Sequence, residues 1–254
     1  MLESVMIRDL YPALLDLLFP PICILCRRPL SSSSRPFQLC DGCQARVLPN
    51  RPPFCNLCSC PVTEETGPLC PRCRRTSYHF DQVWACAPYH GAMKDLLHLF
   101  KYRQKTALRF FFANRMAAFL KTHGISLSAF DVILPVPLHS ARLRERGYNQ
   151  SALLAQELCR QGQRPLTAPL LQRVRNTKSQ TTLRQKERWT NIQSAFTIKY
   201  PLAFKHKNVL IVDDLFTTGA TTSEAARVLK QAGARRVVVL TLAIAIQPST
   251  GSSA

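Results

Sequence analysis

The chain has 254 residues, which is enough for one large domain or for a domain with an appendage. Its 34 lysine and arginine residues against 15 aspartate and glutamate residues give a net charge of +19, which favours polyanionic partners, although for any single residue a solvated basic surface is the simpler interpretation. Charged residues interrupt the apolar first 21 residues, which excludes a signal peptide or a spanning helix there, and no later segment is long enough to cross a membrane.

The first segment predicts a short amphipathic docking helix. Leu10, Leu14, Leu17 and Leu18 share one helical face, and Pro20-Pro21 end the helix. We divide the chain into this helix (1–21), a cysteine-rich module (22–78), a larger domain (79–246) and a flexible tail (247–254).

Nine of the eleven cysteines lie between Cys23 and Cys73, and eight of them form four Cys-x2-Cys pairs in two sets. Two such pairs close a tetrahedral zinc site with no open position for water, so we expect structural zinc, one or two ions. Spacing leaves open which pairs share an ion, and redox chemistry is the alternative. We expect a cytoplasmic protein, because paired cysteines hold metal there more often than they form disulfides. The predicted ligands are Cys23, Cys26, Cys40, Cys43, Cys55, Cys58, Cys70 and Cys73, and Cys60 could substitute for a neighbour.

Residues 83–136 predict a strand, helices over 93–102 and 107–121, and a buried strand over 131–136. The basic segment LPVPLHSARLRERGYNQ follows, and we interpret it as a loop. Residues 173–193 are polar, basic and apparently uncapped. They could form a mobile hood over a substrate, a single-stranded nucleic-acid contact with Trp189 as a stacking platform, or an ordinary exposed helix.

The segment from 207 to 234 is the most informative stretch of the chain. The run 209–212 is apolar without alternation, as in a strand buried on both faces of a parallel sheet. Asp213 and Asp214 follow at its carboxyl end, where open α/β sheets bind ligands. The segment 221–224 resembles a capping box, so we expect a helix from about Thr222 to a stop at Gly233, preceding a buried strand over 237–246.

The residues between this strand and helix suit a phosphate. Thr217, Thr218, Gly219, Ala220 and Thr221 offer hydroxyl and backbone N–H donors at a helix N-terminus. Two adjacent carboxylates disfavour joint ionisation unless a donor or cation lies between them. Ribose hydroxyls with Mg²⁺ resolve this conflict, whereas the simpler alternative is a strand that ends in an ordinary turn.

VLIVDDLFTTGAT resembles the ribose-phosphate signature of type I phosphoribosyltransferases. The resemblance implies that phosphoribosyl pyrophosphate binds with Mg²⁺, with Asp213 and Asp214 on the ribose and residues 217–221 around its 5′-phosphate. It also implies diphosphate binding by guanidinium groups of the basic loop and a hood that closes over the leaving group. The residues implied are His139, Arg142, Arg144, Arg146 and Lys101 for the diphosphate, and Lys178, Gln180, Arg184 and Arg188 in the hood.

Together with FKYRQ, RGYNQ and the cysteine module, these motifs resemble the ComF/GntX family of competence-associated proteins. The resemblance implies an α/β fold of the type I phosphoribosyltransferase kind, a mostly parallel sheet flanked by helices, behind an N-terminal zinc ribbon. It further implies a role in DNA uptake beside a helicase-like partner. We expect phosphoribosyl transfer with Asp213 and Asp214 as the catalytic residues. The alternatives are a single-stranded DNA adaptor or nucleotide sensor without turnover, and a cysteine module that serves as a scaffold for a partner protein.

Overall fold

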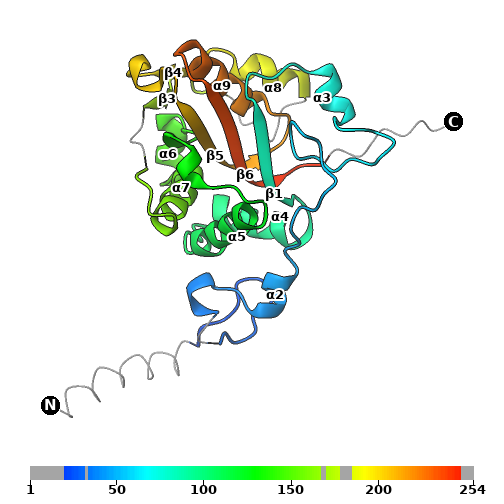
Figure 1. Cartoon of the computed structure of the whole chain (residues 1–254). Helices are drawn as coiled ribbons and strands as arrows, with labels where there is room; N and C mark the ends of the chain where they lie inside the picture. The colour runs from blue at the N-terminus through cyan, green and yellow to red at the C-terminus, as the bar shows by residue number, and fades with distance from the viewer. Residues whose placement is uncertain (1–19, 32–33, 167–169, 178–184, 247–254) are drawn as a thin grey trace.

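A four-stranded parallel sheet lies at the centre of the molecule (Figure 1). The computed structural model describes residues 20–31, 34–166, 170–177 and 185–246. The strand order is β1-β6-β5-β2, and each pairing is parallel. The strands are β1 (Gln82–Pro88), β2 (Val132–Pro135), β5 (Asn208–Phe216) and β6 (Arg236–Ile244), with an antiparallel pair of β3 (Leu171–Arg173) and β4 (Phe196–Ile198) beside them. The predicted α/β fold with a mostly parallel sheet is confirmed.

Helices cover both faces of the sheet, because alternate residues of its buried strands point to opposite sides. Leu210 and Val212 of β5 pack into a core with α4 (Gly91–Tyr102), α5 (Leu108–Thr122) and α7 (Gln150–Gln161). Val209 and Ile211 pack into a second core with α9 (Ala220–Gln231) and the end of α8 (Gln185–Ile192). This explains why 209–212 is apolar without alternation. The short elements are α2 (Asp41–Ala45), α3 (Pro71–Arg75), α6 (Ser140–Arg146), η1 (Arg35–Phe37), η2 (Leu127–Ala129) and η3 (Pro201–Phe204).

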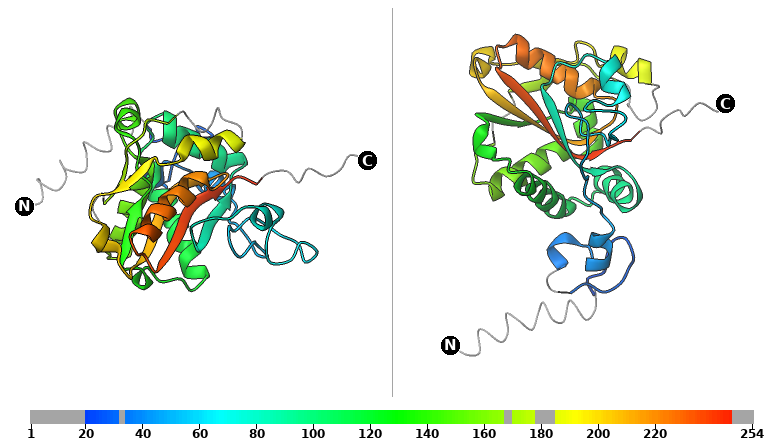
Figure 2. Two further views of the ribbon diagram at one scale, coloured as in Figure 1. Left: turned by 90° about the horizontal axis from the view of Figure 1, so that it is seen from above. Right: turned by 45° about the vertical axis from the view of Figure 1, so that its right-hand side comes forward.

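The two cysteine sets pack against opposite faces of this α/β body. Cys23 and Cys43 join the core that contains α4 and α5, whereas Cys55, Cys58 and Cys70 join the core that contains α9. In the right-hand view of Figure 2, the blue segment that contains α2 lies below the sheet. The module is therefore not one detached appendage, since each half completes a different core.

Two local predictions differ from the structure. The basic loop contains helix α6. Helix α9 begins at Ala220 with Gly219 as its N-cap, two residues before the predicted start near Thr222, so the predicted capping box is wrong. Because Gly219 is the N-cap, Glu224 is the fifth residue of α9 and lies beyond the N3 position that a capping box requires. The Glu224 carboxylate instead accepts hydrogen bonds from the Ser194 amide (2.7 Å) and from Arg227 (2.7 Å). Residues 185–192 of the polar segment form α8, and a helix was one of the three interpretations of that segment.

Several predictions fall outside the described residues, namely those on residues 1–19, on the tail 247–254, and on Lys178, Gln180 and Arg184. Within the described part of the chain, no helix combines the length and the apolar character that a membrane span requires.

Candidate functional site

The turn after β2 brings the start of α7 to the end of β5. Gly147 has a φ of +83° and ends α6, a left-handed geometry that glycine adopts at little cost. The Asn149 side-chain oxygen accepts hydrogen bonds from the amides of Ser151 (3.0 Å) and Ala152 (3.3 Å), and its amide donates to the Val136 carbonyl (3.0 Å). This cap ties the first turn of α7 to the end of β2, and so directs Ser151 toward β5.

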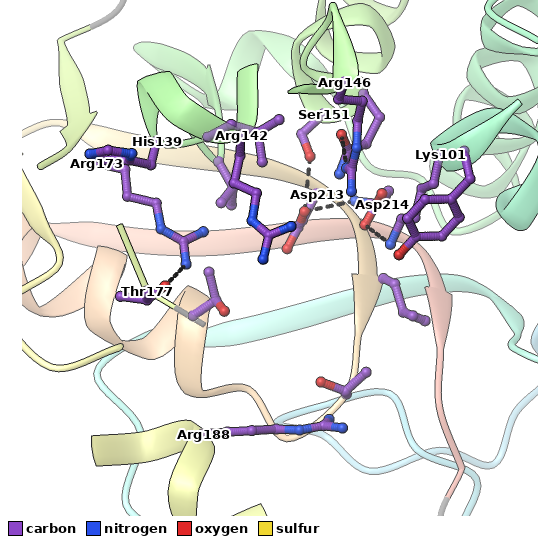
Figure 3. A pocket seen from close by; sticks show the side chains of 17 residues that line it. Lys101, His139, Arg142, Arg146, Ser151, Arg173, Thr177, Arg188, Asp213 and Asp214 are labelled. Atoms are coloured by element: carbon purple, nitrogen blue, oxygen red, sulfur yellow. Dashed lines mark hydrogen bonds and ion pairs between the residues drawn. The ribbon is translucent and has the colours of Figure 1, made fainter. Parts of the chain in front are cut away.

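Asp213 and Asp214 form a buried pair in β5, 9% and 3% exposed respectively. The Ser151 hydroxyl donates to Asp213 Oδ1 at 2.9 Å, and the Asp214 amide donates to the same oxygen at 2.9 Å. Lys101 Nζ lies 2.9 Å from Asp214 Oδ1 (Figure 3). Asp214 Oδ2 is buried and has no hydrogen-bond partner among the described residues. An acceptor oxygen is thus left for a ligand that donates a hydrogen bond or for a cation.

The electrostatics of the pair follow from burial. The pKa of Asp213 is raised to about 7: burial is the largest cause, the charge of Asp214 adds to the rise, and Lys101 opposes it. Burial lowers the pKa of Lys101, but the attraction of Asp214 and the hydrogen bond to it outweigh burial, so that pKa is raised. Near neutral pH, Asp213 therefore exchanges a proton readily while Lys101 keeps its charge.

The free energy of unfolding is expected to fall as the pH rises from about 4 to about 7. A carboxyl group with a raised pKa binds more protons in the folded chain than in the unfolded chain, so its stabilising contribution is complete below its ordinary pKa and is lost as the pH passes about 7. The difference between the raised pKa of Asp213 and its ordinary value of 3.8 limits the loss of stability over this pH range to about 4 kcal/mol. Urea unfolding of the wild type and of Asp213→Asn across this pH range measures the free energy of unfolding. It should depend less on pH in Asp213→Asn than in the wild type. The same pH dependence in both proteins would contradict the raised pKa of Asp213.

A pocket of about 190 Å³ opens over the acid pair. Basic side chains from four segments line it, and in Figure 3 Arg188 enters from the side opposite to His139, Arg142 and Arg146. Its basic lining consists of Lys101, His139, Arg142, Arg146, Arg173 and Arg188. A ligand that carries several negative charges would meet cations on both sides, with the carboxylates beneath it.

Four of the five side chains predicted to bind diphosphate line this pocket, and Arg144 does not. Because α6 is a helix, Arg142 and Arg146 are four residues apart and share a face, whereas Arg144 lies between them on another face and is exposed. Lys101 lines the pocket but is paired with Asp214, which differs from its expected place on a diphosphate. A buried carboxylate without a cation would be costly, which explains this pairing.

The threonine loop surrounds the N-terminus of α9, where Gly219 has a φ of +83°. Thr217 and Thr221 line the main pocket, and Gly219 and Ala220 line an adjoining cavity of about 20 Å³. Thr218 is 2% exposed and lines neither space. Its hydroxyl accepts a hydrogen bond from the Ala220 amide (3.4 Å). The loop therefore presents two threonines and a helix N-terminus to the pocket.

Several residues that line the pocket were not predicted from the sequence, among them Gln150, Ser151, Arg173 and Thr177. Gln150 accepts a hydrogen bond from Arg146 (2.6 Å), and Arg173 donates to the Thr177 hydroxyl. The helix cap at Asn149 was the one local signal that pointed toward Ser151. No local pattern marks Arg173, because the β3-β4 pair brings it to the pocket.

The cysteines form two four-sulfur clusters, and within each cluster the Sγ atoms lie within 4.8 Å of one another. The first cluster joins the first two Cys-x2-Cys pairs and the second joins the last two, a pairing that spacing left open. Cys40 and Cys70 cap the short helices α2 and α3, which places Cys43 and Cys73 one turn further on. Both clusters fit structural zinc. Cys60 lies outside the second cluster.

We expect two zinc ions per chain. Cys43→Ser and Cys73→Ser should each lower the zinc content by about one ion per chain, because a three-thiolate site with a weak hydroxyl ligand binds zinc poorly. Elemental analysis of the purified protein measures this. A content of one ion in the wild type, or the loss of both ions in a single variant, would contradict two independent sites.

Comparisons with known proteins agree with these features. Residues 14–76 match the model of a double zinc ribbon domain. The chain is 30% identical over 231 residues to competence protein F of Haemophilus influenzae, covering 87% of this chain and 96% of the relative. It is 31% identical over 228 residues to DNA utilization protein YhgH of Escherichia coli K12, with coverage of 87% and 95%. Competence protein ComFC of Bacillus subtilis is 30% identical over 203 residues, with coverage of 77% and 79%.

Proposed function

The chain belongs to the family of competence protein F, ComFC and YhgH, and from that premise we propose that it binds phosphoribosyl pyrophosphate with Mg²⁺ and transfers its phosphoribosyl group in the handling of DNA taken up by the cell. The observation that carries the proposal is the buried pair Asp213 and Asp214, followed directly by a loop of threonines at a helix N-terminus, at the base of a pocket lined by basic side chains.

The sugar would lie over the acid pair. Two vicinal hydroxyls of the ribose would donate to Asp213 and Asp214, where Asp214 Oδ2 lacks a partner among the described residues. The 5′-phosphate would bind between Thr217 and Thr221, where the positive end of the α9 dipole favours an anion. A neutral sugar could satisfy the buried acceptors, but it would leave the helix N-terminus without an anion.

The diphosphate would face the basic side of the pocket. Arg142 and Arg146 share one face of α6, and Arg188 lies opposite, so guanidinium groups reach its oxygens from two directions. The acid pair supplies the oxygen ligands that Mg²⁺ prefers, directly or through ribose hydroxyls. When bound, Mg²⁺ would neutralise part of the charge that develops on the leaving group.

The transfer needs no covalent intermediate with the protein. The bond between C1 of the ribose and the diphosphate oxygen breaks, its electron pair leaves with pyrophosphate, and an acceptor nitrogen forms the new bond to C1. The carboxylates of Asp213 and Asp214 stabilise the positive charge that develops on the ribose ring, while Arg142 and Arg146 hold the departing pyrophosphate. Asp213 is the residue whose pKa, about 7, suits a proton acceptor near neutral pH.

Titration calorimetry tests the binding step. Phosphoribosyl pyrophosphate with Mg²⁺ should bind, whereas ribose 5-phosphate or pyrophosphate alone should bind at least about tenfold more weakly, since each occupies half of the pocket. Equal affinity for pyrophosphate alone would show that the site recognises only polyphosphate, and the proposal would then be wrong.

A second candidate function is single-stranded DNA binding without turnover. Tyr102 lines the pocket, is 50% exposed and carries the Arg146 guanidinium 5.3 Å from its ring centre, a combination that suits a stacked base beside a phosphate. Such binding weakens steeply with salt. Binding of an unlabelled single-stranded oligonucleotide is measured over a series of salt concentrations, with and without phosphoribosyl pyrophosphate. Binding that phosphoribosyl pyrophosphate displaces uses this pocket, whereas binding that it leaves unchanged uses a separate surface.

A further inference from the structure

The segment that carries the second cysteine cluster contacts the phosphate loop through Arg72 and Tyr78. Arg72, which lies between Cys70 and Cys73 in α3, donates a hydrogen bond to the Thr217 carbonyl at 2.5 Å. The Tyr78 hydroxyl, six residues later, donates to the Thr218 carbonyl at 3.0 Å. Two consecutive carbonyl groups of the loop are therefore bonded to residues 72–78, which begin within the last Cys-x2-Cys pair of the second cluster and continue past it.

Arg72 joins the cluster to the loop through one guanidinium group. Its Nη2 lies 3.4 Å from Cys58 Sγ, while its Nη1 bonds to Thr217, and its Cζ lies 5.2 Å from the centre of the Phe216 ring. A planar guanidinium with donors in a fixed fork holds both partners at a set separation. A shift of Cys58 would thus be transmitted to Thr217.

The same segment packs against the back of the loop. The Tyr78 and Phe80 rings are stacked at 4.7 Å, and Phe80 meets Phe216 edge-on at 5.9 Å. The His79 amide donates to the Ser223 hydroxyl in the first turn of α9 at 3.1 Å. Contacts therefore extend from the last residue of β5, across the loop, into α9.

These contacts set the direction of the loop amides. In a trans peptide the carbonyl and the next N–H point to opposite sides of the chain. Because the carbonyls of Thr217 and Thr218 point toward the second cluster, the N–H groups of Thr218 and Gly219 point away from it. Fixed amides that face an anion bind it more tightly than amides that must first be ordered.

We propose that Arg72 is a positioning residue for the phosphate loop, and that the second zinc site acts through it to hold residues 217–221 in the shape that receives a phosphate. The inference rests on the proposed function for its ligand but adds a task for the cysteine module. Among the described residues, the first cluster is tied to the opposite core instead: Cys23 and Cys43 pack there, and Arg115 in α5 donates a hydrogen bond to the Gln44 carbonyl at 2.7 Å.

The test compares Arg72→Gln with Arg115→Gln, a matched change in an arginine that bonds to a backbone carbonyl between the module and the body. Hydrogen exchange of the loop amides is measured on the full chain without ligand, with zinc content determined for each variant. We expect exchange of 217–221 to be at least about tenfold faster in Arg72→Gln, at unchanged zinc content, and within about twofold of wild type in Arg115→Gln. Arg72→Lys, which keeps the charge but not the fork, should lie between them and serves if Arg72→Gln fails to fold.

Calorimetry with phosphoribosyl pyrophosphate and Mg²⁺ is the second arm. Affinity is expected to fall at least about tenfold in Arg72→Gln and to stay within about twofold in Arg115→Gln. Wild-type exchange in the loop of Arg72→Gln, or equal acceleration in Arg115→Gln, would overturn the inference. A wild-type chain that binds no phosphoribosyl pyrophosphate would defeat the proposed function instead, and the exchange arm would still decide whether Arg72 holds the loop.

Discussion

Asp213→Asn and Asp214→Asn together are expected to weaken binding of phosphoribosyl pyrophosphate with Mg²⁺ by at least about 100-fold, which corresponds to about 2.7 kcal/mol. Each substitution replaces a charged acceptor by a neutral one, and hydrogen bonds to charged groups contribute about 1.5 to 3 kcal/mol each. Titration calorimetry at about pH 8, above the pKa of Asp213, measures the loss. The exposed carboxylate Asp95 of α4, changed to Asn, removes one charge away from the pocket and should leave affinity unchanged.

The two single variants should differ in stability, which separates loss of a ligand contact from loss of the fold. Asp213→Asn should raise the free energy of unfolding above pH 7, because it removes a carboxylate that burial disfavours while keeping an acceptor for Ser151. Asp214→Asn should lower it by about 2 kcal/mol or more, since Lys101 is left without its partner. Wild-type affinity in either variant would contradict the placement of the ribose.

Gly219→Ala is expected to destabilise the protein by about 3 kcal/mol or more and to abolish phosphate binding. A Cβ at this position would lie 2.7 Å from the Tyr78 ring and 2.8 Å from the Phe216 ring, and the φ of +83° is itself unfavourable for alanine. The clash pushes the loop away from the rings that support it, so the geometry of the anion site is lost along with stability. Chemical unfolding and calorimetry on the same preparation measure both effects.

Gly147→Ala provides the matched comparison. Gly147 has the same φ of +83°, but a Cβ there would have no neighbouring atom within 4 Å. Gly147→Ala should therefore lower the free energy of unfolding only by the cost of a positive φ in alanine, about 1 kcal/mol. The difference between the variants isolates the packing of Tyr78 and Phe216 against the loop. Equal destabilisation by both substitutions would mean that these rings do not confine Gly219.

Local patterns predicted the central part of the site. The unbroken apolar run 209–212 predicted a strand buried on both faces, and the order of acids, threonine loop and helix placed a candidate ligand site at its end. The Cys-x2-Cys spacing predicted the four-sulfur clusters. These features were readable because each depends on residues close together in the chain, whose spacing alone determines which face or turn they share.

Other features depend on residues far apart in sequence. The capping box predicted at Glu224 was wrong because α9 begins at Ala220, which leaves that carboxylate to Ser194 and Arg227. Arg144 does not reach the pocket because α6 turns it to another face. Neither outcome follows from composition. The segment with Arg144, for example, is equally basic whether it forms a helix or a loop.

The sequence by itself determined the α/β fold, the eight cysteines of the two clusters, and the order of acid pair, threonine loop and helix. Only the tertiary structure decided which cysteine pairs share a cluster, that Lys101 pairs with Asp214, and that Arg72 and Tyr78 donate hydrogen bonds to the loop carbonyls. The reason is physical: strand and turn propensities act over a few residues, whereas burying a charge or a carbonyl requires a partner that the packing of distant segments must supply.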